Sequence, residues 1–421
     1  MTSAGATPSA ARLLRASALI AGSVVVARAL NLGFRYLVAR EMPVAEYGRV
    51  ALMLVTANFL AQLGTWNLGN AAARHVAGAS AIGALLGKLS RLATVTGALA
   101  AVACAAALLR LGEPARVAAV LGISVLAYAL QNLAEGVLRA FGANWPQALG
   151  IVVTAFTRVT VLLVLVVGLG TTVGASAVAA VFSVGTLVAA AIVVGIAMRW
   201  PRGRAAGPDA SAVSYLRLLR FGGALTVSSL VTLGLGFVNR LLLRRHVGLE
   251  EVAHYDNALL AYSALQAFLS AFVLVSIPAY ATAGPEAAVR VAKVGRTLAL
   301  FVAAWAGLFA AHRFGWTDAG FRAAGVAGYA GMFPVLLVIL LGFPFELMFV
   351  SISGPLQARD RVVEIGMASC VAAVVGLGVA WIAIPRWEVA GAAVSTLSSA
   401  VVLAAAAARL RAAHGLRLDR R

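Results

Sequence analysis

The sequence predicts an all-α integral membrane protein with about 12 transmembrane helices, arranged as two pseudo-symmetric six-helix bundles around a central cavity. Composition gives the first reason: 62% of the 421 residues are hydrophobic, 12% are charged, and the mean hydropathy is +0.94. Soluble domains are roughly 45–50% apolar and about 25% charged, so a soluble protein is excluded. The apolar runs are also continuous and rich in Ala, Leu and Val, whereas barrel strands alternate apolar and polar residues. Matching motifs in the two halves give the third reason.

Twelve apolar runs are bounded by charged residues, glycine or proline, and a membrane-spanning helix needs about 20 such residues. The first six runs cover residues 17–39, 50–69, 92–109, 117–138, 147–168 and 173–197. The second six cover residues 221–243, 257–280, 297–312, 324–350, 362–384 and 389–408. Helix breakers inside the runs mark candidate kinks, because they free backbone groups that a neighbouring helix or a cavity must satisfy. These breakers are Gly234, Gly236, Pro278, Pro334 and Pro344.

The longest connection, residues 199–220, is rich in arginine and contains two prolines and two glycines, which is typical of a linker. We therefore expect five parts: an N-terminal tail, a first bundle, this linker, a second bundle and a basic C-terminal tail. Their bounds are residues 1–16, 17–198, 199–220, 221–408 and 409–421. An even number of spans places both termini on one side of the membrane. The tails and loops of that side carry roughly twice as many basic residues as the opposite loops, so both termini are expected in the cytoplasm of a bacterial inner membrane.

The net charge of +19 comes from 34 Lys and Arg against 15 Asp and Glu. Most of the excess lies in short connections, where basic residues orient helices, so no nucleic acid is expected as a partner. The chain has no Gly-x-x-x-x-Gly-Lys loop for a nucleotide, and its five histidines are scattered. We therefore expect no cofactor, no metal and no catalytic residues.

Three motifs recur in the same order in both halves, which indicates duplication of a six-helix unit about an axis along the membrane normal. Two arginines five residues apart end the first and the seventh span, and each pair is followed by a Glu and then a Tyr. Small residues around a leucine end the fourth and the tenth span. The matched residues are Arg35 and Arg40 with Arg240 and Arg245, Glu46 and Tyr47 with Glu251 and Tyr255, and 136–140 with 354–358.

The segment Ala39-Arg40-Glu41-Met42-Pro43-Val44-Ala45-Glu46-Tyr47-Gly48, with Gln62-Leu63-Gly64 and Arg74 after it, resembles the opening signature of the bacterial polysaccharide flippases. These belong to the multidrug/oligosaccharidyl-lipid/polysaccharide exporter superfamily. The second half looks like a repeat of that signature, from Phe221-Gly222-Gly223 through Asn239-Arg240 to Tyr255, although members often carry Asp where this chain has Asn239.

The resemblance covers the whole chain and implies a flippase with twelve or more helices and a central cavity. Such a protein moves a lipid-linked (polyprenyl-pyrophosphate) oligosaccharide from the cytoplasmic to the outer leaflet by alternating access. The implied partners are the lipid-linked glycan, the bilayer, and the glycan polymerase and glycosyltransferases of the same biosynthesis.

Arg28 lies midway along the first predicted span, where a charge costs about 2.5–3.5 kcal/mol and must face protein or water. Arg35 follows two helical turns later on the same face, and Arg158 lies midway along the fifth span. Guanidinium groups match phosphate oxygens, so a lipid pyrophosphate is the expected guest. The alternative is that each arginine is neutralised internally, Arg28 for example by Glu135. The full predicted substrate-binding set is Arg28, Arg35, Arg158, Arg240, Gln62 and Asn239.

Two acidic residues lie well inside predicted spans, Glu135 and Glu346, and they are candidates for ion coupling. Two alternative functions stay open. A cation-coupled multidrug exporter of the same superfamily would need an acidic and aromatic cavity, which the arginines of the first span argue against. A membrane glycosyltransferase or ligase would need a sizeable aqueous loop with acid or base residues, but the longest connection carries Asp209 as its only acid.

Overall fold

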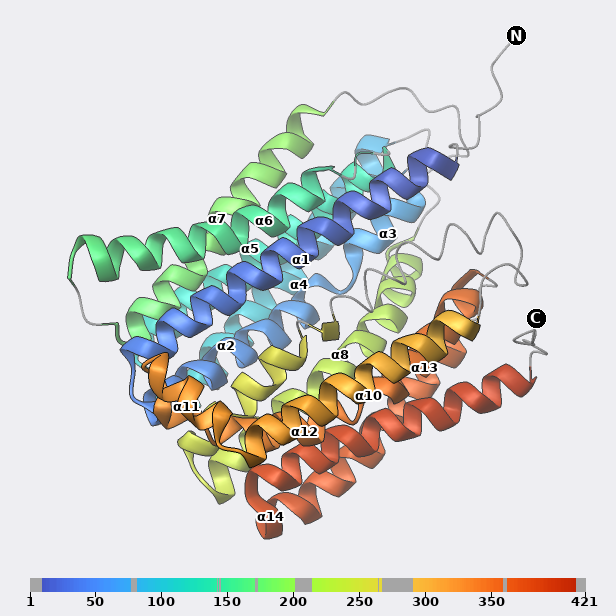
Figure 1. The fold of residues 1–421 in the computed structure, drawn as a ribbon. Coiled ribbons are helices and arrows are strands. Elements are labelled where there is room, and N and C mark those ends of the chain that lie inside the picture. Colours follow the sequence, from blue (N-terminus) through green and yellow to red (C-terminus); the bar gives the residue numbers. More distant parts are fainter. Residues whose placement is uncertain are drawn as a thin grey trace.

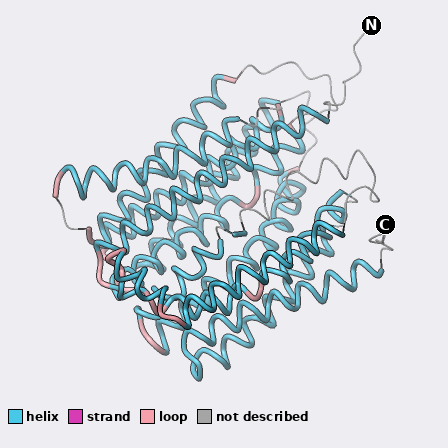
Figure 2. The backbone as a smooth tube through the Cα atoms, in the orientation of Figure 1, coloured by secondary structure: helices cyan, strands magenta, loops and turns pink. Residues whose placement is uncertain are grey.

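The computed structural model describes residues 10–76, 82–141, 143, 145–170, 173–200, 214–263, 265–266, 291–358 and 362–413. Within these residues every regular element is a helix (Figure 2). The first half contains α1 (Ala10–Glu41), α2 (Val44–Thr65), α3 (Leu68–His75), α4 (Ile82–Arg110), α5 (Ala115–Ala140), α6 (Trp145–Leu163), η1 (Val164–Gly168) and α7 (Ala175–Arg199). The second half contains α8 (Tyr215–His246), a helix at residues 249–263, α10 (Val291–Arg313), α11 (Trp316–Ala323), η3 (Ala327–Tyr329), α12 (Met332–Leu340), α13 (Phe343–Ala358) and α14 (Val362–Ala413).

The helices form two lobes that lie side by side (Figure 1). In the first lobe, α1 packs on α6, α2 on α4 and α5, and α7 on α5 and α6. In the second lobe, α14 packs on α8, α12 and α13. The start of α1 and the end of α14 lie at the same end of the molecule (Figure 1). We call the opposite end, which carries the turn between α1 and α2, the distal end.

Seven of the described helical segments are long and apolar enough to cross a membrane, and a bent pair within α8 adds an eighth. The bend is 42° between Tyr215–Val231 and Leu233–His246, next to the predicted breakers Gly234 and Gly236. In α14, Pro385 and the left-handed backbone of Glu388 (φ 53°) turn the chain, so this element covers the last two predicted spans. The chain is therefore a multi-pass membrane protein, and the predicted all-α fold class is confirmed.

Several predicted features are placed differently or lie outside the described residues. The predicted span at residues 324–350 is divided between α12 and α13, which meet at Leu341 and Gly342, next to Pro344. Pro278, the second part of the predicted span 257–280, and residues 201–213 of the predicted linker are outside the described residues. The domain boundaries stay predictions.

Contacts of α2 and the two residues after it with α8 join the two lobes, and we call this interface the α2–α8 seam. Midway along it, the rings of Phe59 and Phe237 stack with centroids 4.8 Å apart. Nearer the termini, Asn67 donates a hydrogen bond to Thr226 (3.3 Å), and the indole N–H of Trp66 donates one to the carbonyl of Leu219 (3.0 Å). Trp66 and Asn67 have left-handed backbones (φ 44° and 48°), which separate α2 from α3 and turn the indole towards α8.

The two lobes are also closed against each other at the distal end. The hydroxyl of Tyr36 donates to the carbonyl of Ala324 (2.8 Å), and Arg244 donates to the carbonyl of Leu111 (2.8 Å). Gly48 of α2 lies so close to the helix at 249–263 that an added Cβ would overlap the carbonyl of Leu249. A residue without a side chain is required at this crossing, because the obstacle is helix backbone and cannot rotate away.

Candidate functional site

A cavity of about 420 Å³ lies between the lobes, within the range of about 300–1,000 Å³ that is typical of ligand sites. Helices α1, α2, α6 and α7 supply its wall from the first lobe, and α8, the helix at 249–263, α13 and α14 supply the other wall. Its charged lining consists of Arg28, Arg35, Arg158, Arg240, Asp256 and Glu346. Four arginines thus face two acids, so the lining carries an excess of positive charge.

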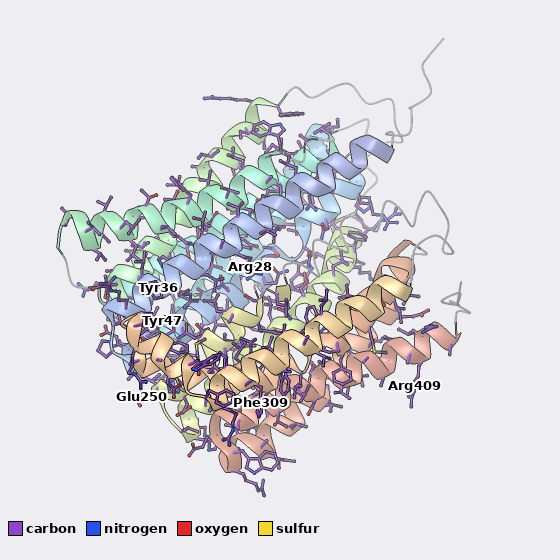
Figure 3. All side chains as sticks on the ribbon, in the orientation of Figure 1. Arg28, Tyr36, Tyr47, Glu250, Phe309 and Arg409 are labelled. Atoms are coloured by element: carbon purple, nitrogen blue, oxygen red, sulfur yellow. The ribbon has the colours of Figure 1, made fainter. Side chains whose placement is uncertain are left out.

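Arg28 lies midway along α1 and points between the lobes (Figure 3). Its side chain is exposed to the cavity, and its Nη1 donates a hydrogen bond to the hydroxyl of Ser263 in the other lobe (3.3 Å). Among the described residues it forms no ion pair with an acid. The alternative of an ion pair with Glu135 is not found, because the carboxylate of Glu135 instead accepts a hydrogen bond from Gln131 within α5 (2.9 Å).

Arg158 of α6 is held by neutral groups. Its guanidinium lies 3.7 Å from the ring centroid of Phe182, donates to the hydroxyl of Thr186 (3.0 Å), and reaches the carbonyl of Phe182 (3.4 Å). These contacts from α7 orient the side chain but leave its charge without a carboxylate in the described part of the chain. Such a charge attracts an anion strongly, since it is only partly solvated.

Arg35 and Arg240 share one carboxylate, that of Asp256. Arg240 donates from Nε (3.0 Å) and Nη2 (2.6 Å) to Oδ1 of Asp256, whereas Arg35 lies 3.3 Å from Oδ2. The hydroxyl of Tyr47 also contacts Oδ2 (3.4 Å) and donates to Asn257 (2.8 Å). Because Arg35 and Tyr47 belong to the first lobe, this carboxylate links the two lobes between the cavity and the distal end.

The two arginines have equivalent local surroundings. The guanidinium of Arg35 lies 5.9 Å from the ring centroid of Tyr47, and that of Arg240 lies 5.4 Å from the ring centroid of Tyr255. These are the residues that the repeated motif pairs with each other. After the tyrosine the halves differ, because the first lobe has Gly48 and the second has Asp256.

Glu346 of α13 lines the cavity in the second lobe. The amide of Gln266 donates to both of its carboxylate oxygens (2.9 and 3.1 Å). This neutral hydrogen bonding holds the carboxylate in place without compensating its charge, as a site for a proton or a small cation requires.

Three residues of the predicted site do not line the cavity. Asn239 is fully buried within the second lobe, where it donates to Tyr255 (2.8 Å) and accepts from Ser395 (3.3 Å). Gln62 of α2 and Glu135 of α5 lie outside the lining as well. The polar side chains that contribute instead include Asn31, Asn58 and Ser263.

Asp256 is the residue that sequence reasoning missed. It is 4% exposed, but it comes one residue before the predicted span at 257–280 and directly after a polar stretch, so its position resembles that of a loop acid. A usable signal was present: Asp256 follows Tyr255, the counterpart of Tyr47, where the first half has glycine. An acid at a place where one repeat has a small residue is a candidate for an interface role.

The described residues contain no group of three or more His, Cys, Asp or Glu side chains that could hold a metal ion. The cavity offers an excess of positive charge, hydrogen-bonding side chains and an apolar surround. It is suited to binding an anionic group.

Comparison with protein families gives a match between residues 13–283 and the model of a family described as polysaccharide biosynthesis protein. The matched segment contains α1 to α8 and all of Arg28, Arg35, Arg158, Arg240 and Asp256. A comparison with curated protein sequences gives no match.

Solved structures of similar fold are transporters of the MOP superfamily. The inward-facing conformation of a multidrug resistance MATE family transporter has a TM-score of 0.73 at 15% identity, covering 97% of this chain and 99% of that one. An outward-facing conformation of such a transporter has a TM-score of 0.62 at 14% identity, covering 99% and 100%. A MOP superfamily transporter from Pyrococcus furiosus, described as having a binding pocket of reverse polarity, has a TM-score of 0.58 at 13% identity, covering 97% and 99%. These similarities establish the two-lobed fold, and the chain is more similar to the inward-facing example.

Proposed function

Because the chain belongs to the family of polysaccharide biosynthesis proteins, we propose that it is a transporter rather than an enzyme, and that it moves a lipid-linked oligosaccharide across the membrane. The substrate is a polyprenyl-pyrophosphate glycan, carried from the cytoplasmic to the outer leaflet by alternating access. The pyrophosphate binds the arginines of the cavity while the glycan occupies the space between the lobes. Both termini are cytoplasmic in this proposal, so the closed distal end faces outward.

The observation that carries the proposal is the excess of arginine in the cavity. Arg28 and Arg158 lie in different helices of the first lobe, line the same cavity, and have no carboxylate partner within the described residues. A guanidinium at membrane depth is retained at a cost of several kcal/mol, which a bound phosphate offsets through charge-assisted hydrogen bonds. Asn31 and Asn58 beside them provide donors and acceptors for sugar hydroxyl groups.

A cation-coupled multidrug exporter is the second candidate, and Glu346 is the observation in its favour. Its carboxylate lines the cavity and accepts hydrogen bonds from the neutral amide of Gln266. In a flippase the same group would serve ion coupling, whereas Glu135 lies outside the cavity lining. The surplus of positive charge opposes a cationic drug, so we place Glu346 in coupling rather than in drug binding.

Substitution of Arg28 tests the proposal. Arg28→Ala should abolish flipping at an unchanged level of folded protein. Arg28→Lys should retain part of the flipping activity, because lysine keeps the charge but lacks the planar guanidinium that donates two parallel hydrogen bonds. The measurement is the accumulation of lipid-linked glycan on the cytoplasmic leaflet, together with the amount of protein in the membrane.

Arg40→Ala is the matched control, since Arg40 is an exposed arginine of the same helix that does not line the cavity. This control should flip the glycan normally. Normal flipping by well-expressed Arg28→Ala would refute the role of Arg28, and binding of organic cations in place of prenyl pyrophosphates would favour the drug exporter.

A further inference from the structure

We propose that Asp256 is an internal counter-ion that the substrate pyrophosphate displaces from Arg35, and that this exchange releases the lobes at the distal end. The inference rests on the proposed function, because it needs an anionic substrate in the cavity. The exchange would couple binding of substrate in the cavity to separation of the lobes at the distal end. The ligand chemistry that it requires is a diphosphate group.

The geometry of Asp256 is unequal towards the two lobes. Its Oδ1 accepts two short hydrogen bonds from Arg240 of the same lobe, 2.6 and 3.0 Å long. Its Oδ2 faces the first lobe with longer contacts, 3.3 Å to Arg35 and 3.4 Å to the hydroxyl of Tyr47. Because hydrogen bonds weaken with distance, the contacts between the lobes are the ones that an incoming anion breaks first.

Arg35 is the arginine positioned for exchange. It lies seven residues after Arg28 on α1, which is two helical turns, and both line the cavity with Arg158. A diphosphate that binds Arg28 and Arg158 therefore approaches Arg35 from the cavity. A diphosphate carries more negative charge than the single carboxylate and offers more oxygen acceptors, so it competes well for the guanidinium.

Loss of the contact between Arg35 and Asp256 has a mechanical consequence. Among the described residues this is the ion pair that crosses between the lobes, since the pair of Arg49 and Glu113 lies within the first lobe and that of Arg240 and Asp256 within the second. The remaining links at the distal end are hydrogen bonds to backbone carbonyls, from Tyr36 to Ala324 and from Arg244 to Leu111. Substrate binding thus removes the ion pair between the lobes and leaves hydrogen bonds to backbone carbonyls.

The test uses Asp256→Asn, which preserves shape and removes the competing charge. Purified full-length protein in nanodiscs is titrated with farnesyl pyrophosphate, with inorganic pyrophosphate, and with farnesol as the uncharged control. Asp256→Asn should bind pyrophosphate about tenfold or more tightly, because the carboxylate no longer competes for the guanidinium of Arg35. Tightening only with farnesyl pyrophosphate would assign the site to the lipid carrier, and equal tightening with both would assign it to the diphosphate alone; either supports the exchange.

Opening of the distal end is measured as the distance between nitroxide labels at Ala115→Cys and Ala390→Cys, with Cys104 and Cys370 replaced by alanine. The labelled positions are exposed and lie in α5 and α14, one in each lobe. Pyrophosphate should lengthen this distance in the otherwise unchanged chain, and Asp256→Asn should lengthen it without ligand.

Two further variants separate exchange from a purely structural ion pair. Arg35→Gln should also lengthen the distance, but it should weaken pyrophosphate binding, so the two partners of one ion pair should shift affinity in opposite directions. Glu113→Gln is the matched control, because it removes the ion pair with Arg49 inside the first lobe and should leave the distance unchanged.

The outcomes distinguish this inference from the proposed function. If no variant binds either pyrophosphate, the proposed function is overturned and the inference with it. If the unsubstituted protein binds pyrophosphate but Asp256→Asn binds it equally or less tightly, only the inference is overturned. If Asp256→Asn does not fold, the pyrophosphate titration of the unsubstituted labelled protein decides, and an unchanged distance at saturation refutes the exchange.

Discussion

Replacing Gly48 with alanine should shift the lobes towards a state that is open at the distal end. The added methyl group would overlap the carbonyl of Leu249 and would lie 3.3 Å from the amide nitrogen of Ala253. Both atoms belong to a helix backbone in the other lobe, so the clash is relieved only by moving the helices apart. When the lobes separate there, the methyl group meets no obstacle from Leu249.

The size of the shift follows from the cost of overpacking, which is typically about 1–3 kcal/mol. This cost applies only to the closed state, so the ratio of open to closed molecules should rise between roughly 5-fold and 150-fold. The gain in helix propensity from glycine to alanine, about 1 kcal/mol, affects both states equally because α2 is helical in each.

The distance between labels at Ala115→Cys and Ala390→Cys measures this ratio directly. Gly33→Ala in α1 is the matched control, since an added Cβ there has no neighbour within 4 Å, and it should leave the distance distribution unchanged. If Gly48→Ala folds and its distance distribution coincides with that of Gly33→Ala, the crossing at Gly48 does not hold the lobes closed and the reasoning is refuted.

Two further predictions concern stability. Asn239→Ala should lower the amount of folded protein, with a loss of about 1–3 kcal/mol, because it removes buried hydrogen bonds to Tyr255 and Ser395. Flipping per folded molecule should persist, and a selective loss of flipping would return Asn239 to the substrate site. His254 at the distal end is half-buried, which lowers its pKa, but its contacts with Glu251 (3.4 Å) and the carbonyl of Gly328 (3.1 Å) outweigh burial and raise the pKa above the ordinary value. The stabilisation from a raised pKa is complete below about pH 6.5, the ordinary pKa of histidine, and is lost as the pH rises through the pKa of His254 in the folded protein. Thermal unfolding should therefore occur at a lower temperature at about pH 9 than at about pH 5.5. His254→Gln should flatten this dependence, and an unchanged dependence would assign it to other groups.

The sequence predicted the membrane class and most helices because these depend on local composition. Long apolar runs have no alternative to helix in lipid, and prolines such as Pro43 and Pro114 immediately precede α2 and α5. The arginines of the cavity were also predictable, since a charge inside an apolar run is conspicuous. Arg28, Arg35 and Arg158 stand out on that ground alone and do line one cavity.

The partners of those residues were not predictable, because they depend on how the lobes meet. Asp256 is separated from Arg35 by more than half of the chain and follows a polar stretch with Glu250 and Glu251 that is typical of a loop. Asn239 occupies a motif position next to Arg240, but neighbouring residues on a helix point in different directions, and Asn239 turns into the lobe while Arg240 turns to Asp256. A motif indicates which helix matters, whereas packing decides which of its side chains reaches the cavity.

The α2–α8 seam restricts the path that a lipid-linked molecule can take. The rings of Phe59 and Phe237 stack across this seam, and the indole of Trp66 reaches the carbonyl of Leu219, so the lobes are in contact on this side at two levels. If the chain moves a lipid-linked glycan as proposed, a polyprenyl tail that stays in the bilayer requires the head group to enter from the side, and α1 and the helix at 249–263 line the cavity away from this seam. There the guanidinium of Arg28 contacts Ser263 of the other lobe, so the proposed head group would meet this charge as it enters the cavity.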